Sequence, residues 1–104
     1  MIDENNRIKI IDFGFSIIIP KDKKLNVFCG TPSYMAPEIV RRRPYYGKPT
    51  DVWSLGILLY ALVCGKFPFK GHRNKQLFRK ITQGNLYIPD HIDALLASLL
   101  KSIL

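Results

Sequence analysis

The sequence predicts a mainly α-helical fold with a short β-hairpin. Apolar residues recur at helical spacing in residues 50–64, 74–83 and 90–104, whereas only residues 7–11 alternate in the manner of a half-buried strand. Glycine and proline separate these segments and mark the connections between them. A length of 104 residues fits one domain or part of one.

The hairpin is expected at the N-terminus, and a short helix follows an irregular stretch. Residues 7–11 form the strand, and residues 1–3 are its expected partner across an asparagine-containing turn. Residues 15–35 contain proline and glycine and predict no regular element. Pro37 suits the first turn of a helix reaching about Arg42, because proline lacks the N–H that a helix start leaves unpaired.

The longest predicted helix covers residues 50–64 and should form the centre of the domain. Thr50 is its expected N-cap, because a threonine oxygen can accept a hydrogen bond from the first turn, and Gly65 is expected to end it. Its apolar residues lie nearly all round the helix, which predicts burial on every side. A loop is predicted before it by three helix breakers, Pro44, Gly47 and Pro49.

Two further helices are expected in residues 72–104. The first runs from about Asn74 to Gln83, and Gly84 ends it. Asp90 is the expected cap of the second. The apolar face of that last helix consists of Ile92, Leu95, Leu96, Leu99 and Leu100.

The chain is strongly basic, with 16 Lys and Arg against 8 Asp and Glu and a formal net charge of +8. Solvated surfaces are the simplest interpretation, and attraction to acidic partners is the next. A nucleic-acid partner is not expected, because the basic clusters are not interleaved with exposed aromatic residues. No stretch is long and apolar enough for a membrane span. Without an export signal, Cys29 and Cys64 indicate a reduced, cytoplasmic setting.

Two triplets point to chemistry. Asp12-Phe13-Gly14 follows the predicted strand, and Ala36-Pro37-Glu38 opens the short helix. A carboxylate at a glycine turn can reach a divalent cation held between phosphates, and Mg²⁺ prefers one or two carboxylates together with phosphate and water. The first triplet on its own is either a magnesium site or an ordinary turn at the end of a strand, and the second triplet downstream favours the magnesium site.

These triplets and three longer motifs resemble serine/threonine protein kinases. The motifs are Phe28 to Glu38, Asp51 to Gly56 and Gly65 to Phe69. The resemblance is strongest to the calcium/calmodulin-dependent and AMP-activated group, nearest the microtubule-affinity-regulating kinases. It implies that residues 1–104 are a partial C-terminal (large) lobe of the protein kinase fold. Its expected parts are the hairpin (1–12), the activation segment (12–38), the central buried helix (50–64) and further helices (72–104).

The resemblance implies functions for individual residues, in a complete domain that uses ATP and Mg²⁺. Asp12 would bind the metal, and Asp12, Phe13 and Gly14 would form part of the cofactor site. The substrate-docking residues would be Gly30, Thr31, Pro32, Ser33 and Tyr34. The structural anchors would be Glu38, Asp51, Trp53, Leu58 and Leu62.

Several of these residues are expected to contact parts of the kinase fold outside the chain. Thr31 would hydrogen-bond the catalytic aspartate, and Asp51 would hold the catalytic loop. Glu38 would pair with an arginine beyond Leu104. Leu58 and Leu62 would support the column of side chains below the adenine ring. Phe15 resembles the kinase type that prefers serine over threonine as acceptor.

Three positions bear on regulation and specificity. Related kinases usually carry a phosphorylatable threonine where this chain has Val27, so activation is expected without that phosphate. Ala61 follows Tyr60 where some kinases that prefer basic substrates carry a glutamate, so one contact for a substrate arginine is missing. Cys29 is either a redox-sensitive thiol or a small residue that packs the docking loop.

The catalytic aspartate is expected upstream of Met1, so Met1 is interpreted as an internal methionine of a longer kinase, and the isolated chain is predicted to be inactive. Two functional hypotheses remain. The chain is a fragment of a kinase that phosphorylates protein serine or threonine. Alternatively, it is a non-catalytic module that binds substrates or a kinase partner. Exposed apolar surface is expected to favour association.

Overall fold

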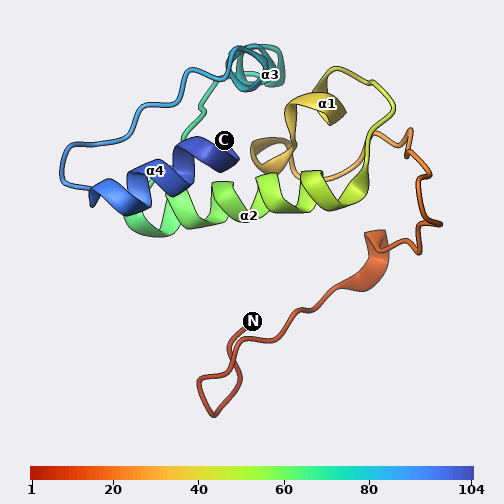
Figure 1. The fold of residues 1–104 in the computed structure, drawn as a ribbon, viewed down its shortest axis with the longest axis horizontal. Helices are drawn as coiled ribbons and strands as arrows, with labels where there is room; N and C mark the ends of the chain where they lie inside the picture. The colour runs from red at the N-terminus through yellow and green to blue at the C-terminus, as the bar shows by residue number, and fades with distance from the viewer.

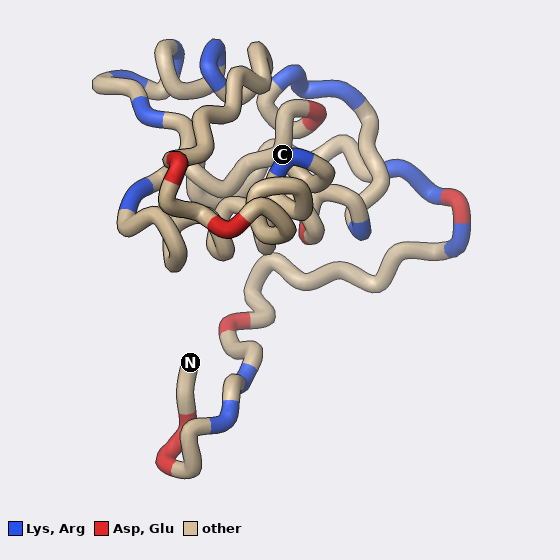
Figure 2. Tube along the Cα trace, turned by 60° about the vertical axis from the view of Figure 1, so that its left-hand side comes forward, with Lys and Arg blue, Asp and Glu red and all other residues tan.

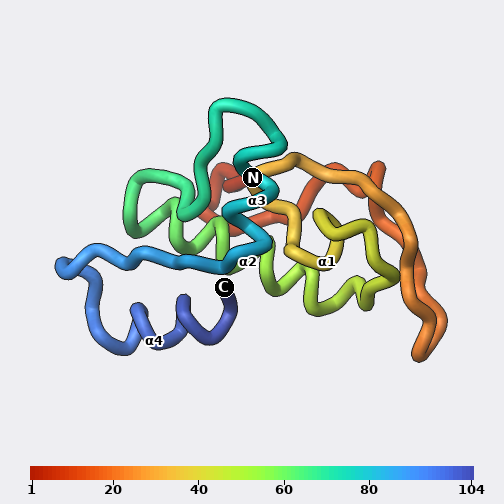
Figure 3. Tube along the Cα trace, turned by 90° about the horizontal axis from the view of Figure 1, so that it is seen from above, coloured from red at the N-terminus to blue at the C-terminus, as the bar shows by residue number.

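The computed structural model describes all residues, 1–104, and it is mainly helical, as predicted. Figure 1 shows the longest helix, α2, running along the body with α4 beside it and with α1 and α3 above it. Figure 3 gives the same body from above. The helices are α1 (Pro37–Val40), α2 (Gly47–Cys64), α3 (Asn74–Gln83) and α4 (Ala94–Ile103), and two single 3₁₀ turns are η1 (Phe13–Phe15) and η2 (Pro32–Tyr34). No helix has the length and apolar character needed to cross a bilayer.

The predicted hairpin is reduced to a single antiparallel bridge between Ile2 and Ile8. The half-buried strand expected at residues 7–11 is not formed, because Ile8 and Ile10 are exposed and no further pairing extends the bridge. The Asp3 carboxylate holds the turn, because it accepts hydrogen bonds from the backbone N–H groups of Asn5 and Arg7 at 2.9 and 2.8 Å. This arm projects from the helical body (Figure 1). The radius of gyration is therefore 14.9 Å, against about 13 Å for a compact domain of this length.

The expected start of the central helix is wrong by about one turn. α2 begins at Gly47, so Pro49 lies in the first turn, where its missing N–H breaks no hydrogen bond. Thr50 is inside the helix rather than at its cap, and its hydroxyl donates to the Gly47 carbonyl at 2.6 Å. The end is as expected, because Gly65 adopts the left-handed conformation (φ 66°) that closes a helix.

Burial of α2 is one-sided, which corrects the prediction of a helix buried all round. Its buried face carries Trp53, Gly56, Ile57 and Tyr60 at the spacing of one helical stripe. The opposite face is apolar but exposed, because the other helices of the chain pack on the first face. The exposed side chains are Val52, Leu55, Leu58 and Leu62.

The other helices differ from expectation mainly at their ends. α1 stops at Val40, short of Arg42, while α3 has the expected bounds and ends at Gly84 (φ 67°). α4 is capped by Asp93 rather than Asp90. The Asp93 carboxylate accepts hydrogen bonds from the backbone N–H groups of Leu95 and Leu96 in the first turn (2.9 and 3.3 Å). Asp90 lies in a turn before the helix.

The apolar face expected for α4 is only partly buried. Leu100 is fully buried, but Leu95 is 83% exposed. The contact between α4 and α2 depends on Gly56, since a Cβ atom there would collide with Ile103. The main core joins α2 to α3, the docking region and the turn after α2; its buried members are Ala36, Trp53, Ile57, Phe69, Leu77 and Ile81.

Candidate functional site

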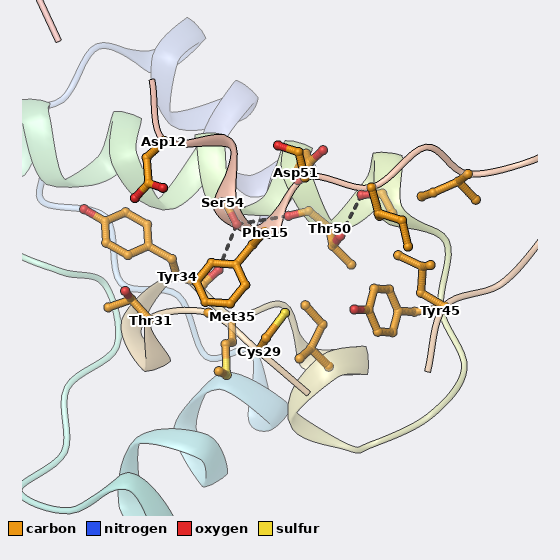
Figure 4. Close-up of a pocket in the computed structure, with 17 residues that line it drawn as sticks. Asp12, Phe15, Cys29, Thr31, Tyr34, Met35, Tyr45, Thr50, Asp51 and Ser54 are labelled. Atoms are coloured by element: carbon orange, nitrogen blue, oxygen red, sulfur yellow. Dashed lines mark hydrogen bonds between the residues drawn. The ribbon is translucent and has the colours of Figure 1, made fainter. Parts of the chain in front are cut away.

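One hollow of about 420 Å³ brings residues of the separate motifs together. Asp12, Thr31 and Asp51 all line it, although they lie in the first triplet, the docking loop and α2 (Figure 4). Its walls also include Phe15, Cys29, Tyr34, Tyr45 and Ser54. The hollow therefore joins the predicted metal ligand, three predicted docking residues (Gly30, Thr31 and Tyr34) and one predicted anchor.

Asp12 stands at the entrance to η1 in a left-handed conformation (φ 62°, ψ 75°), which aspartate tolerates better than most residues. Its Oδ1 atom accepts a long hydrogen bond from the Gly14 N–H (3.4 Å). The Phe13 ring is 67% exposed and does not line the hollow, whereas Phe15 does. Phe13 and Gly14, which were predicted as part of the cofactor site, therefore do not line this hollow.

The predicted docking residues 30–34 are held against α2 and the turn that follows it. Gly30 has a φ of 115°, a value that favours glycine. The Ser54 hydroxyl lies 3.0 Å from the Tyr34 carbonyl and 3.1 Å from the Thr50 carbonyl. The Tyr34 ring meets the Phe67 ring edge to face, with 5.3 Å between centroids. These contacts place Thr31, which is exposed, on the rim of the hollow.

The stretch before the docking loop is tied to Tyr45. Leu25 and Tyr45 exchange two backbone hydrogen bonds, at 2.7 and 2.9 Å. The Tyr45 hydroxyl also donates to the Val27 carbonyl at 2.9 Å. Burial, aided by the neighbouring Cys29, raises the pKa of Tyr45 above its ordinary value, so the hydroxyl keeps its proton further into the alkaline range.

A second set of contacts joins the same stretch to α3. The Phe28 ring packs edge to face on Phe78 at 6.1 Å, and the Arg42 guanidinium lies over Phe28 at 4.4 Å. Arg41 donates to the Thr82 carbonyl in the last turn of α3 at 2.8 Å, where a cation also suits the helix dipole. Two of the three consecutive arginines at positions 41–43, Arg41 and Arg42, therefore hold other parts of the chain in place.

Comparison with known proteins decides the family. The sequence model of the protein kinase domain family matches residues 1–104. The chain belongs to the protein kinase domain family. The mainly helical arrangement is accordingly part of the large lobe that the motifs predicted.

The similar kinases include members of the group suggested by the motifs. NUAK family SNF1-like kinase 1 of Homo sapiens is 51% identical over 86% of the chain, which covers 14% of that protein. Probable serine/threonine-protein kinase MARK-A of Dictyostelium discoideum is 42% identical over the whole chain, which covers 10% of it. Putative sperm motility kinase W of Mus musculus is 45% identical over 98% of the chain, and the chain covers 20% of it. The chain thus spans a small part of these relatives.

The predicted anchors of this kinase region differ in their surroundings. Trp53 is buried and stacks on Phe69 with 6.0 Å between centroids. Glu38 is half-buried and forms no ion pair within the chain, since both ion pairs of the structure involve Asp3. Asp51 is exposed at the hollow. Leu58 and Leu62, which are 42% and 74% exposed, do not reach this hollow.

Protein kinases generally use ATP and Mg²⁺ and act on protein substrates. The chain contains no group of three side chains that could hold a metal by themselves. Asp12 supplies one exposed carboxylate, and a single carboxylate suffices for Mg²⁺ when phosphate and water complete the shell. The residues present therefore fit a shared magnesium site and do not fit an all-protein one.

Sequence reasoning missed Tyr45, Ser54 and the pair Phe28–Phe78. Each acts through a contact between segments far apart in the chain, and no local pattern reports such a contact. Ser54 had one partial signal, because it follows Thr50 by one helical turn and can hydrogen-bond the carbonyl of that residue.

Proposed function

We propose that the chain is part of a serine/threonine protein kinase that transfers the γ-phosphate of ATP to protein serine or threonine. The observation that carries the proposal is the shared hollow. Asp12, Thr31 of the docking loop and Asp51 of α2 all line it. A phosphoryl-transfer site needs a metal ligand beside a platform for the acceptor peptide, and this arrangement supplies both.

Each group has a distinct task in this proposal. The Asp12 carboxylate holds Mg²⁺, which neutralises the phosphates of ATP. Residues 30–34 position the acceptor segment of the protein substrate. Thr31 and Asp51 bind the catalytic loop of the complete domain, and the hollow between them is the space that this loop occupies. The exposed Asp51 and Thr31 side chains, which have no hydrogen-bond partners in the chain, are consistent with such a neighbour. We place the enzyme in the cytoplasm, where both free cysteines stay reduced.

Expression of the complete protein that contains these residues tests the proposal. We expect ATP- and Mg²⁺-dependent phosphorylation of serine and threonine in a degenerate peptide library, with serine preferred because Phe15 follows Gly14. The separate 104 residues are expected to show none, since they contain no His-Arg-Asp catalytic motif. An inactive complete protein would instead support the binding-module hypothesis, and activity of the short chain would contradict the assignment of catalytic residues.

Activation is proposed to proceed without phosphorylation at position 27. Valine cannot accept phosphate, and the Tyr45 hydroxyl and the bridge from Leu25 already hold this stretch. Treating the complete protein with an upstream kinase is therefore expected to leave its activity nearly unchanged, as followed by mass-spectrometric mapping and rate measurement. Stoichiometric phosphate on any residue from Ser16 to Tyr34, with a large gain in rate, would refute this proposal.

A further inference from the structure

The segment between Asp51 and Asp90 is basic and contains no acidic residue. Its six cationic side chains are Lys66, Lys70, Arg73, Lys75, Arg79 and Lys80. None of them forms an ion pair, because both ion pairs of the structure involve Asp3. In Figure 2, blue segments recur along α3 and the loop before it, at the top of the molecule. This surface therefore carries a positive charge that the chain does not neutralise.

Two hollows lie within this surface, with volumes of about 560 and 500 Å³. Lys70 and Lys80 line both of them, as do the rings of Phe67 and Phe69. The two ammonium groups thus stand where the hollows adjoin, beside apolar walls. Lys66 borders the second hollow. A ligand for this surface needs anionic groups and at least one apolar group.

The first hollow is continuous with the proposed acceptor platform, because Ser33 of the docking loop lines it. Phe67 also packs on Tyr34 of that loop. A protein substrate held at residues 30–34 can therefore extend along this surface. The hollow that contains Asp12 differs in charge, because no Lys or Arg lines it.

The charged lining favours carboxylates over nucleic acid. Lysine alone supplies the cations of both hollows, and the forked guanidinium that grips phosphate in two places is absent from them. Stacking of successive bases needs several exposed rings, but Phe69 is buried and Phe67 is only partly accessible beside Tyr34. Tyr87, at the far wall, is the single exposed ring, and Lys66 lies over it at 5.9 Å.

We propose that the surface formed by residues 66–80 is a docking site for an acidic, aromatic-containing segment of the protein substrate, outside its phosphorylated residue. Carboxylates of this segment pair with Lys70 and Lys80, and an aromatic side chain occupies the apolar wall at Phe67. The inference rests on the proposed function, because it takes the docked protein to be the phosphate acceptor. Binding to this surface requires neither ATP nor the Asp12 site.

The test measures binding without nucleotide. The complete protein is titrated against a fluorescein-labelled peptide of alternating Asp and Glu around a central Phe, and anisotropy is recorded. Lys70→Glu/Lys80→Glu is expected to weaken binding by about tenfold or more, since two attractions become repulsions. The matched control, Lys48→Glu/Lys101→Glu, changes the net charge equally at exposed positions outside both hollows and is expected to bind almost as well as the parent.

Three further measurements make the outcome decisive. The Asn and Gln counterpart of the peptide is expected to bind poorly, and Lys70→Gln/Lys80→Gln is expected to lose affinity without charge reversal. Equal loss in the two Glu pairs would show general charge attraction and overturn the proposal, as would tighter binding of a labelled single-stranded oligonucleotide or no binding at all. Because no phosphate transfer is involved, a failed kinase assay leaves this result interpretable and separates the two proposals.

Discussion

Replacing Asp12 with Asn in the complete kinase is expected to lower kcat by about 100-fold or more. Enzymes lose about this much rate when one strong electrostatic contact to the transition state is removed. The substitution removes the charge that we propose binds Mg²⁺ but keeps the size of the side chain. Asparagine also tolerates the left-handed backbone at this position (φ 62°). The measurement is the steady-state rate as a function of Mg²⁺ concentration, with thermal unfolding recorded for each variant.

Asp22 provides a matched control for Asp12. It is also exposed, it has a nearly identical φ of 64°, and Asp22→Asn changes the net charge by the same amount. It does not line the hollow. We expect Asp22→Asn to retain most of the activity. If Asp12→Asn remained nearly as active, or if both variants lost activity together, Asp12 would not be the magnesium ligand.

The parts of the fold that were predictable are those fixed by local chemistry. Gly65 and Gly84 adopt the left-handed conformation that commonly ends a helix. A glycine directly after a helical pattern therefore predicted both helix ends. Pro49 was ambiguous, because proline fits a loop and a first helical turn equally well. Asp90 and Asp93 are equivalent as caps from composition alone, and the turn after Pro89 selects the second.

One-sided burial of α2 shows a different limit. An apolar pattern indicates that a helix can be buried on every side, but it does not indicate which other helices of the same chain will pack on each side. Here Ile57 faces the core, whereas Leu55 and Leu62 face away from it. The predicted association through this exposed face remains a prediction.

The grouping of Asp12, Thr31 and Asp51 was available from the motifs through the family resemblance, but not from their spacing in the chain. Contacts that hold the site were less accessible. The Tyr45 hydroxyl reaches Val27 across 18 positions, and Phe28 reaches Phe78 across a longer interval. Such pairs depend on how the segments pack, so no local pattern in the sequence predicts them.

Ile57→Ala is expected to reduce the free energy of unfolding by about 2–5 kcal/mol, the usual cost of removing a large aliphatic side chain from a core. Ile57 of α2 is fully buried (0% exposed) and belongs to the core cluster that includes Phe69 and Ile81. The lost contacts leave a cavity that neighbouring side chains refill only in part. Chemical denaturation measures the change as a lower midpoint at an unchanged slope.

Ile18→Ala makes the same chemical change at a side chain that is 97% exposed, so it is expected to alter stability little. The comparison tests whether the core lies at the junction of α2 and α3, because that junction also carries the docking loop through Ser54 and Tyr34. A core here predicts that Ile57→Ala weakens acceptor binding together with stability. Equal stability of the two variants would require the core to lie elsewhere, and the platform at residues 30–34 would then lose its structural support.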